Sequence, residues 1–113
     1  MDEEKKIEIE IKVTENGETR THKFAIYPRF DGVHNWENAK KLCEENGGRL
    51  PSISELAITH ACQELDLIKD KTDGTYWSGS LAGSGLAWAQ TFSHGYRGAW
   101  PLTYGYYVRC VRS

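Results

Sequence analysis

The sequence predicts a single α+β domain in which two helices pack against a small, mostly antiparallel sheet, with a β-hairpin at the N-terminus. Residues 1–28, the predicted hairpin segment, contain an alternating apolar and polar pattern over residues 7–14. Residues 34–70 carry two segments of helical periodicity, and the last third of the chain is rich in glycine and aromatic residues. A chain of 113 residues is long enough for one hydrophobic core and too short for two. We therefore expect one domain over residues 1–113.

The N-terminal pattern predicts a two-stranded hairpin. β-Branched residues alternate with charged or polar ones over residues 7–14, as in a strand with one buried face. Asn16-Gly17 is a strong two-residue turn signal, because both residues accept positive φ. This turn places Ile7 opposite Ile26 and Glu10 opposite Lys23. We expect the base of the hairpin to join the domain while its tip projects into solvent.

A first helix is predicted over residues 36–46. Asn35 is a suitable N-cap, and Gly47-Gly48 supplies the left-handed end. Trp36, Ala39 and Cys43 share one face at helical spacing.

A second helix is predicted to begin at Ser52, where Ser52 and Glu55 form a capping box after the extended segment before Pro51. It is expected to end before Asp73-Gly74, which is typical of a turn. The residues expected to be buried on this helix are Ile53, Leu56, Ala57, Ala61, Leu65 and Ile68.

The last third of the chain predicts three short strands, near residues 75–80, 86–92 and 105–112. Glycine-rich loops are expected between them, over residues 81–85 and 93–103. All sixteen acidic residues of the chain precede Gly74, whereas Trp77, Trp88 and Trp100 follow it together with five of the six tyrosines. We expect Trp77 and Trp88 to belong to the core.

The loop over residues 93–103 and its C-terminal neighbour Tyr104 are the candidate ligand-binding surface. Aromatic residues and arginine dominate binding hot spots, and loops on a rigid scaffold commonly carry them. The predicted binding residues are Tyr96, Arg97, Trp100 and Tyr104. The alternative is that Trp100 folds back beneath the loop as its anchor.

Several functional classes lack their signatures in this sequence. The net charge of −2 and the absence of a basic run argue against nucleic-acid binding, and no apolar stretch is long enough for membrane insertion. The four histidines are scattered and no Cys-x-x-Cys occurs, so no zinc site is expected. We expect no catalytic residues, no metal and no cofactor, and thus a domain that is not an enzyme.

A motif series over residues 34–111 identifies a known fold family. The series comprises Trp36…Ala39…Leu42-Cys43, Gly47-Gly48-Arg49-Leu50-Pro51-Ser52, Tyr76-Trp77-Ser78-Gly79-Ser80 and Tyr107-Val108-Arg109-Cys110-Val111. It resembles the compact bacterial C-type-lectin-like domain, as in the tips of intimin and invasin adhesins. It is also similar to the C-terminal modules of surface lipoproteins and collagen-like adhesins. The first thirty or so residues lie outside this resemblance.

The resemblance implies a disulfide between the first helix and the last strand, where Cys43 and Cys110 occupy matching places. Cys62 is then a free, small core residue. The alternative is three reduced, buried cysteines in a cytosolic protein. Lectins of this fold bind calcium through acidic motifs that have no counterpart in the acid-free region here, so we expect no calcium binding.

The resemblance further implies a binding module of a bacterial or phage surface adhesin or lipoprotein, located outside the cell or on its surface. Its expected partner is a host-cell or other surface protein, recognised without calcium. Two alternatives remain open at this stage. One is a metal-independent glycan-binding domain, and the other is a purely structural or oligomerisation domain.

Overall fold

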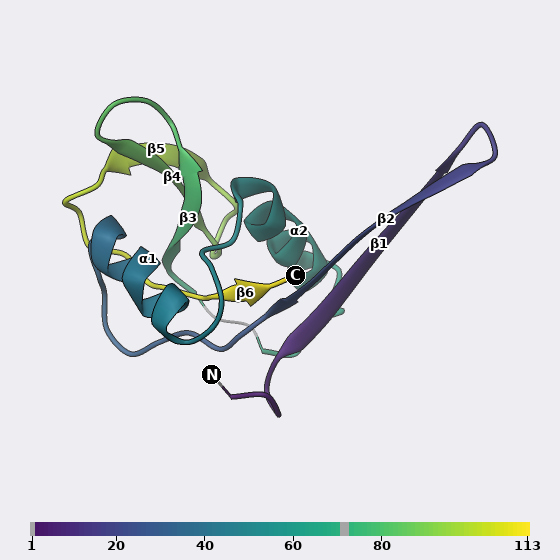
Figure 1. Cartoon of the computed structure of the whole chain (residues 1–113), viewed down its shortest axis with the longest axis horizontal. Helices are drawn as coiled ribbons and strands as arrows, with labels where there is room; N and C mark the ends of the chain where they lie inside the picture. Colours follow the sequence, from purple (N-terminus) through teal and green to yellow (C-terminus); the bar gives the residue numbers. More distant parts are fainter. Residues whose placement is uncertain (1, 71–72) are drawn as a thin grey trace.

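The protein has an α+β architecture with two helices and two small antiparallel sheets in its described part, which covers residues 2–70 and 73–113 of the computed structural model. Figure 1 shows a long hairpin leaving a compact body that contains both helices. The elements in chain order are β1 (Ile7–Glu15), β2 (Glu18–Ile26), α1 (Trp36–Glu45), α2 (Ile53–Glu64), β3 (Thr75–Leu81), β4 (Leu86–Thr91), β5 (Arg97–Pro101) and β6 (Val111–Arg112). The sheet orders are β1-β2-β6 and β3-β4-β5.

The hairpin forms in the predicted register. Ile7 pairs with Ile26 and Glu10 with Lys23, and the turn residues Asn16 and Gly17 have φ values of 52° and 82°. Both turn residues take positive φ, as a two-residue hairpin loop of this kind requires. Val13 near the tip is 53% exposed, so the tip projects into solvent as expected.

The base of the hairpin is fastened to the body by an apolar cluster and by strand pairing. Ile9, Phe24 and Ile26 pack with Ile68 and Val111. Strand β2 also pairs with β6, which places the N-terminal hairpin beside the last strand of the chain.

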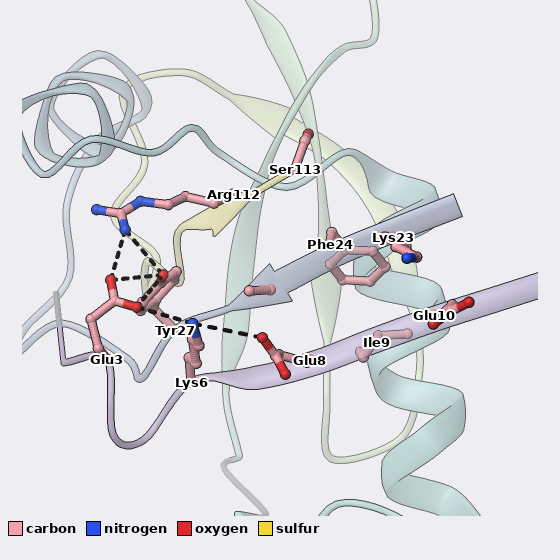
Figure 2. Close-up of a pocket in the computed structure, with 11 residues that line it drawn as sticks. Glu3, Lys6, Glu8, Ile9, Glu10, Lys23, Phe24, Tyr27, Arg112 and Ser113 are labelled. Atoms are coloured by element: carbon pink, nitrogen blue, oxygen red, sulfur yellow. Dashed lines mark hydrogen bonds and ion pairs between the residues drawn. The ribbon is translucent and has the colours of Figure 1, made fainter. Parts of the chain in front are cut away.

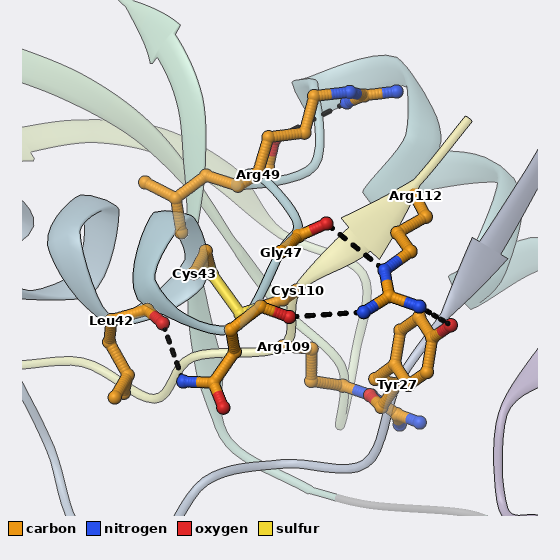
Figure 3. Close-up of a disulfide and its surroundings, with 10 residues drawn as sticks. Tyr27, Leu42, Cys43, Gly47, Arg49, Arg109, Cys110 and Arg112 are labelled. Atoms are coloured by element: carbon orange, nitrogen blue, oxygen red, sulfur yellow. Dashed lines mark hydrogen bonds between the residues drawn. A yellow bond between two sulfur atoms is a disulfide. The ribbon is translucent and has the colours of Figure 1, made fainter. Parts of the chain in front are cut away.

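Helix α1 is anchored to the core by a buried face and a disulfide. Asn35 caps it by accepting a hydrogen bond from the backbone of Asn38 at 2.9 Å. Ala39 and Cys43 are fully buried on its inner face. The predicted bridge between Cys43 and Cys110 is present, with an S–S distance of 2.06 Å, and Cys62 is free. Figure 3 shows the bridge at the end of α1, and this confirms the predicted pairing.

Helix α2 begins as predicted and ends earlier than predicted. The capping box of Ser52 and Glu55 forms in both directions. The helix stops at Glu64, however, because Asp66 takes a left-handed conformation with φ of 58°. Leu65, just past the last helical residue, is therefore 70% exposed. Ala61 lies within the helix, two residues after the buried Thr59 and so on the opposite face, and it is exposed as well. Burial of these two residues was wrongly predicted. Ile68, beyond the turn, is buried as expected.

The second sheet contains a strand where a loop was predicted. Residues 97–101 form β5 and pair with β4 along its length, so the prediction of a loop over the whole of residues 93–103 is wrong. The strand tolerates Pro101 because it is an edge strand, where a missing N–H group breaks no pairing on the open side. The predicted strand over residues 105–112 shortens to Val111–Arg112, with isolated bridges at Tyr106 and Tyr107.

The two faces of this sheet pack against different partners. Trp77, Ala87 and Ala89 lie in one cluster with Cys43 and the inner face of α1. Tyr76 and Phe92 pack with Leu56 of α2. Trp77 is fully buried as predicted, whereas Trp88 is 37% exposed, so its predicted place in the core is wrong. Trp88 stands opposite the small residue Ala99 of the edge strand, which offers it little cover.

Candidate binding surface

Four aromatic rings from β5 and the segments beside it form a continuous group, here called the aromatic cluster: Tyr96, Trp100, Tyr104 and Tyr106. The ring centroids of Tyr96 and Trp100 are 5.9 Å apart, and those of Trp100 and Tyr106 are 5.4 Å apart. Tyr104 and Tyr106 follow at 6.4 Å. The first two contacts are edge-to-face, the arrangement that the charge distribution of aromatic rings favours.

The strand geometry of β5 brings two of these rings together. Side chains alternate along a strand, so Tyr96, residue 98 and Trp100 project from one face. A Cβ atom at Gly98 would lie 2.9 Å from Cη2 of Trp100 and 3.1 Å from Cε1 of Tyr96. The lack of a side chain at Gly98 therefore lets both rings lie against the backbone between them.

The aromatic cluster combines a buried base with an exposed rim. Tyr106 packs edge-to-face on the fully buried Trp77 at 5.0 Å, and Trp100 also packs on this core. Burial raises the pKa of the Tyr106 hydroxyl, and the neighbouring Tyr104 adds to the effect. Tyr96 and Tyr104, by contrast, are 59% and 50% exposed. Trp100 and Tyr106 thus pack on the core, whereas Tyr96 and Tyr104 are exposed to solvent.

The structure brings three of the four predicted binding residues together. Tyr96, Trp100 and Tyr104 belong to the aromatic cluster, with Trp100 half-buried as the anchor that the alternative interpretation anticipated. Arg97 is exposed but alternates to the other face of β5, the face that also carries Trp88. Arg97 is therefore not part of the aromatic cluster, because the strand backbone lies between its side chain and the rings.

Sequence reasoning missed Tyr106 as a member of the cluster. Its spacing of two residues from Tyr104 is the signal that could have identified it, because residues two apart share one face of an extended segment.

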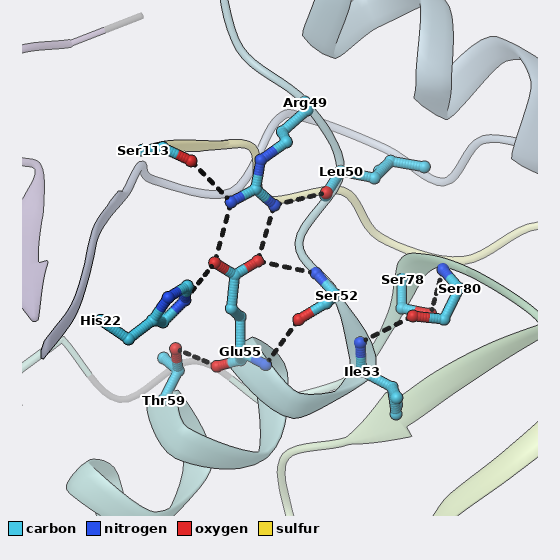
Figure 4. A network of polar contacts seen from close by, with 10 residues as sticks. All are labelled: His22, Arg49, Leu50, Ser52, Ile53, Glu55, Thr59, Ser78, Ser80 and Ser113. Carbon is cyan, nitrogen blue, oxygen red and sulfur yellow. Dashed lines mark hydrogen bonds and ion pairs between the residues drawn. The ribbon is translucent and has the colours of Figure 1, made fainter. Parts of the chain in front are cut away.

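A second group of polar side chains surrounds Glu55 at the start of α2 (Figure 4). Arg49 donates to both carboxylate oxygens at 2.6 and 2.9 Å, and the backbone of Ser52 donates at 2.9 Å. His22 of the hairpin lies 3.0 Å from the same carboxylate. Burial raises the pKa of Glu55, but the hydrogen bonds from Arg49, Ser52 and His22 outweigh it and lower the pKa to about 2. The carboxylate is therefore ionised at neutral pH and fully engaged.

A hollow of about 500 Å³ lies between the hairpin base and Arg112 (Figure 2). Four of the charged side chains that line it, Glu3, Lys6, Glu8 and Arg112, already form ion pairs with one another. Glu3 accepts from Arg112 at 2.7 Å and from the Tyr27 hydroxyl at 3.0 Å, and Lys6 lies 3.2 Å from it. Hydrogen bonds from Lys6 and Tyr27 lower the pKa of Glu3. Much of the charge in this hollow is thus engaged within the chain, whereas the aromatic cluster exposes two rings.

Within residues 2–70 and 73–113, no three His, Cys, Asp or Glu side chains gather closely enough to hold a metal ion. Among the helices of this described part, none has the length and apolar character needed to cross a membrane.

Comparison with known proteins places most of the body in one family. A family model described as "Domain of unknown function (DUF8780)" matches residues 29–112. The match begins after the hairpin and includes both helices, the disulfide and the aromatic cluster. No curated protein matches the chain.

Proposed function

The chain belongs to the DUF8780 family, whose function is unknown, and we propose that it is a non-catalytic module that binds a protein ligand through the aromatic cluster. The observation that carries this proposal is that two exposed tyrosines, Tyr96 and Tyr104, lie against two rings that pack on the core, Trp100 and Tyr106. Exposed aromatic rings on a rigid base lose little conformational entropy when they are buried by a partner. Tyrosine and tryptophan are also enriched at the residues that contribute most to binding.

The polar groups of the body support a binding role more than a catalytic one. A general base needs a pKa near the operating pH, whereas the pKa of Glu55 is lowered to about 2 and its oxygens are occupied. The hydrogen bonds of this network join the hairpin, α2 and the chain end, so its role is to hold elements together.

The C-type-lectin-like identity and the surface location belong to the same proposal. The disulfide from α1 to the residue before β6 and the pair of helices are features that this fold shares. A bridge between two fully buried cysteines persists in an oxidising compartment, in line with a surface adhesin or lipoprotein outside the cell. The acid-free sequence from Gly74 onward supports ligand recognition without calcium.

Metal-independent glycan binding is the second candidate function. The faces of exposed aromatic rings stack on the apolar faces of sugars, and at least half of the surface of Tyr96 and of Tyr104 is exposed. The two functions use the same surface and differ in the ligand.

A binding screen of the intact, oxidised chain tests the proposal. Cultured cells and a glycan array are the two probes, and binding to cells that survives removal of their glycans indicates a protein ligand. Tyr96→Ala and Tyr104→Ala are expected to weaken binding by at least about tenfold, because losing a hot-spot ring commonly costs ~2 kcal/mol. Their melting temperatures should stay close to that of the parent chain.

Two further variants locate the edge of the surface. Leu81→Ala, at a residue that is 59% exposed in β3, is the control and should bind normally. Arg97→Ala should weaken binding only if the ligand also contacts the opposite face of β5, which carries Arg97. Normal binding by both tyrosine variants would show that the aromatic cluster is not the binding surface.

A further inference from the structure

Within the described residues, the hairpin presents a strand edge that pairs with no other strand. Strand β1 is the outer strand of the order β1-β2-β6, so one edge of its nine residues faces away from the sheet. In a hairpin closed by a two-residue turn, the residues that flank the turn form a hydrogen-bonded pair, so the odd-numbered residues of β1 bond to β2. The backbone groups of Glu8, Glu10, Lys12 and Thr14 therefore point outward. Such an edge is a template for another strand.

We propose that two copies of this chain associate by antiparallel pairing of their β1 strands about a two-fold axis at Ile11. The two hairpin sheets would then join into one continuous sheet. This surface is separate from the aromatic cluster, so the inference goes beyond the proposed binding function. The hairpin also lies outside the residues that the family model matches, so pairing through it would be a property of this chain rather than of the shared domain.

The charge pattern of β1 is complementary to itself in this register. With Ile11 opposite Ile11 of the second copy, Glu10 stands opposite Lys12 of the second copy and the reverse pair forms by symmetry. Glu10 and Lys12 are both solvent-accessible and lie 3.4 Å apart within one chain. Opposite charges directly across two strands stabilise the pairing.

Neighbouring registers lack this complementarity. Hydrogen bonding requires outward-pointing residues to face each other, so the register can shift only in steps of two. One such shift places Glu10 opposite Glu10, and the other places Lys12 opposite Lys12. Like charges directly opposite each other destabilise a strand pair. The register centred on Ile11 is also the one in which all residues from Ile7 to Glu15 find a partner.

The apolar face of the hairpin gains cover in the same arrangement. Val13 is 53% exposed in the single chain, because it lies beyond the cluster at the hairpin base. The proposed register places it opposite Ile9 of the second copy, whose side chain packs in that cluster. The exposed side chain of Val13 would thus be covered by the base of the second copy's hairpin.

Charge reversal tests the proposed pairing in solution. Sedimentation of the oxidised chain over micromolar to millimolar concentrations should show a monomer–dimer equilibrium. Glu10→Lys and Lys12→Glu should each raise the dimer dissociation constant at least about tenfold, because two attractive pairs become repulsive. Glu18→Lys, which makes the same charge change on β2, is the matched control and should dimerise like the parent. Circular dichroism checks that each variant is folded.

Mixing the two single variants gives the decisive result. In the mixture, the two lysines of the Glu10→Lys variant face the two glutamates of the Lys12→Glu variant. A heterodimer should therefore form with the affinity of the parent dimer, although each variant alone dimerises at least about tenfold more weakly. The same rescue is expected in the double variant that carries both changes. A parent chain that stays monomeric at millimolar concentration, single variants that dimerise normally, or a mixture that does not associate would each overturn the proposal.

Discussion

Glu55 shows how much one side chain can do beyond the role that its sequence context suggests. The capping box accounts for two of its hydrogen bonds, and these were predictable from the spacing to Ser52. The bidentate bond from Arg49 and the contact with His22 join the start of α2 to the segment before it and to the distant hairpin. No local pattern contains that information, because it depends on where the hairpin and the Arg49–Leu50 segment lie after folding.

Glu55 should make the stability of the fold depend on acid pH. Its pKa is lowered from the usual 4.5 to about 2 in the folded chain, so the carboxylate contributes stability above pH 4.5 that is lost as pH falls towards 2. The contribution is about 2–3 kcal/mol, allowing for the partial exposure of Arg49. Glu55→Gln should lower the unfolding free energy at neutral pH by about this amount and flatten its acid dependence. Urea unfolding over a pH series measures both effects.

Glu45 provides the matched control for this prediction. It is an exposed glutamate at the end of α1, so Glu45→Gln makes the same chemical change outside the network. Its unfolding free energy should stay within about 0.5 kcal/mol of the parent at every pH. Equal losses in the two variants would mean that the network around Glu55 is not the cause.

Gly98 should be intolerant of even a methyl group. A Cβ atom would lie 2.9 Å from Trp100, so Gly98→Ala must displace the rings on either side and should cost about 1–3 kcal/mol. Near-ultraviolet circular dichroism should change with the ring positions. Gly79→Ala in β3 is the comparison, because its Cβ would meet Leu50 at an ordinary 3.4 Å. A normal spectrum for Gly98→Ala would show that the rings are loosely held.

At the scale of the elements, the sequence predicted those features that depend on residues close together in the chain, namely turns and helix caps. The turn at Asn16-Gly17 determined the hairpin register, and the caps at Asn35 and Ser52 determined where both helices begin. Strand β5 was missed because its stability comes from pairing with β4, and its glycine and proline argue for a loop when the sequence is considered alone. The early end of α2 depends on the left-handed Asp66, an uncommon conformation for a residue other than glycine.

The hairpin should behave energetically as two parts. Phe24 is 3% exposed in the basal cluster, so Phe24→Ala should lower the unfolding free energy by about 3–4 kcal/mol. Val13→Ala near the tip should cost less than about 1 kcal/mol, because Val13 is 53% exposed. Chemical unfolding at dilute protein concentration, where self-association is negligible, measures both. A large loss for Val13→Ala would show that the tip is covered in the single chain.

At the scale of the whole molecule, the sequence identified the half that carries the candidate site but not its shape. Composition indicated the acid-free, aromatic region, and three of the four predicted binding residues lie in the aromatic cluster. Arg97 was grouped with them because it is adjacent in sequence. Adjacent residues on a strand point to opposite faces, and that separation became visible only once residues 97–101 proved to be a strand.

The bridge between Cys43 and Cys110 should be the largest single contribution to stability among the features described here. It closes a separation of 67 residues, which corresponds to about 4 kcal/mol in the chain-entropy treatment. Cys43→Ser with Cys110→Ser should lower the unfolding free energy by roughly this amount, whereas Cys62→Ala should cost about 1 kcal/mol. Mass spectrometry of a non-reduced digest should show the 43–110 linkage, and any linkage through Cys62 would contradict the pairing.

The same bridge determines how the domain would respond to tension along its backbone. A pull applied at the two ends would first separate the short pairing of β2 with β6, because β6 lies at the very end of the chain and β2 in its N-terminal hairpin. Extension would then stop at the disulfide, since the segment between Cys43 and Cys110 cannot lengthen while the bond is intact. Helix α2, the second sheet and the aromatic cluster all lie between these cysteines. The aromatic cluster, enclosed in this way, would keep its shape under a load that has already drawn out the hairpin.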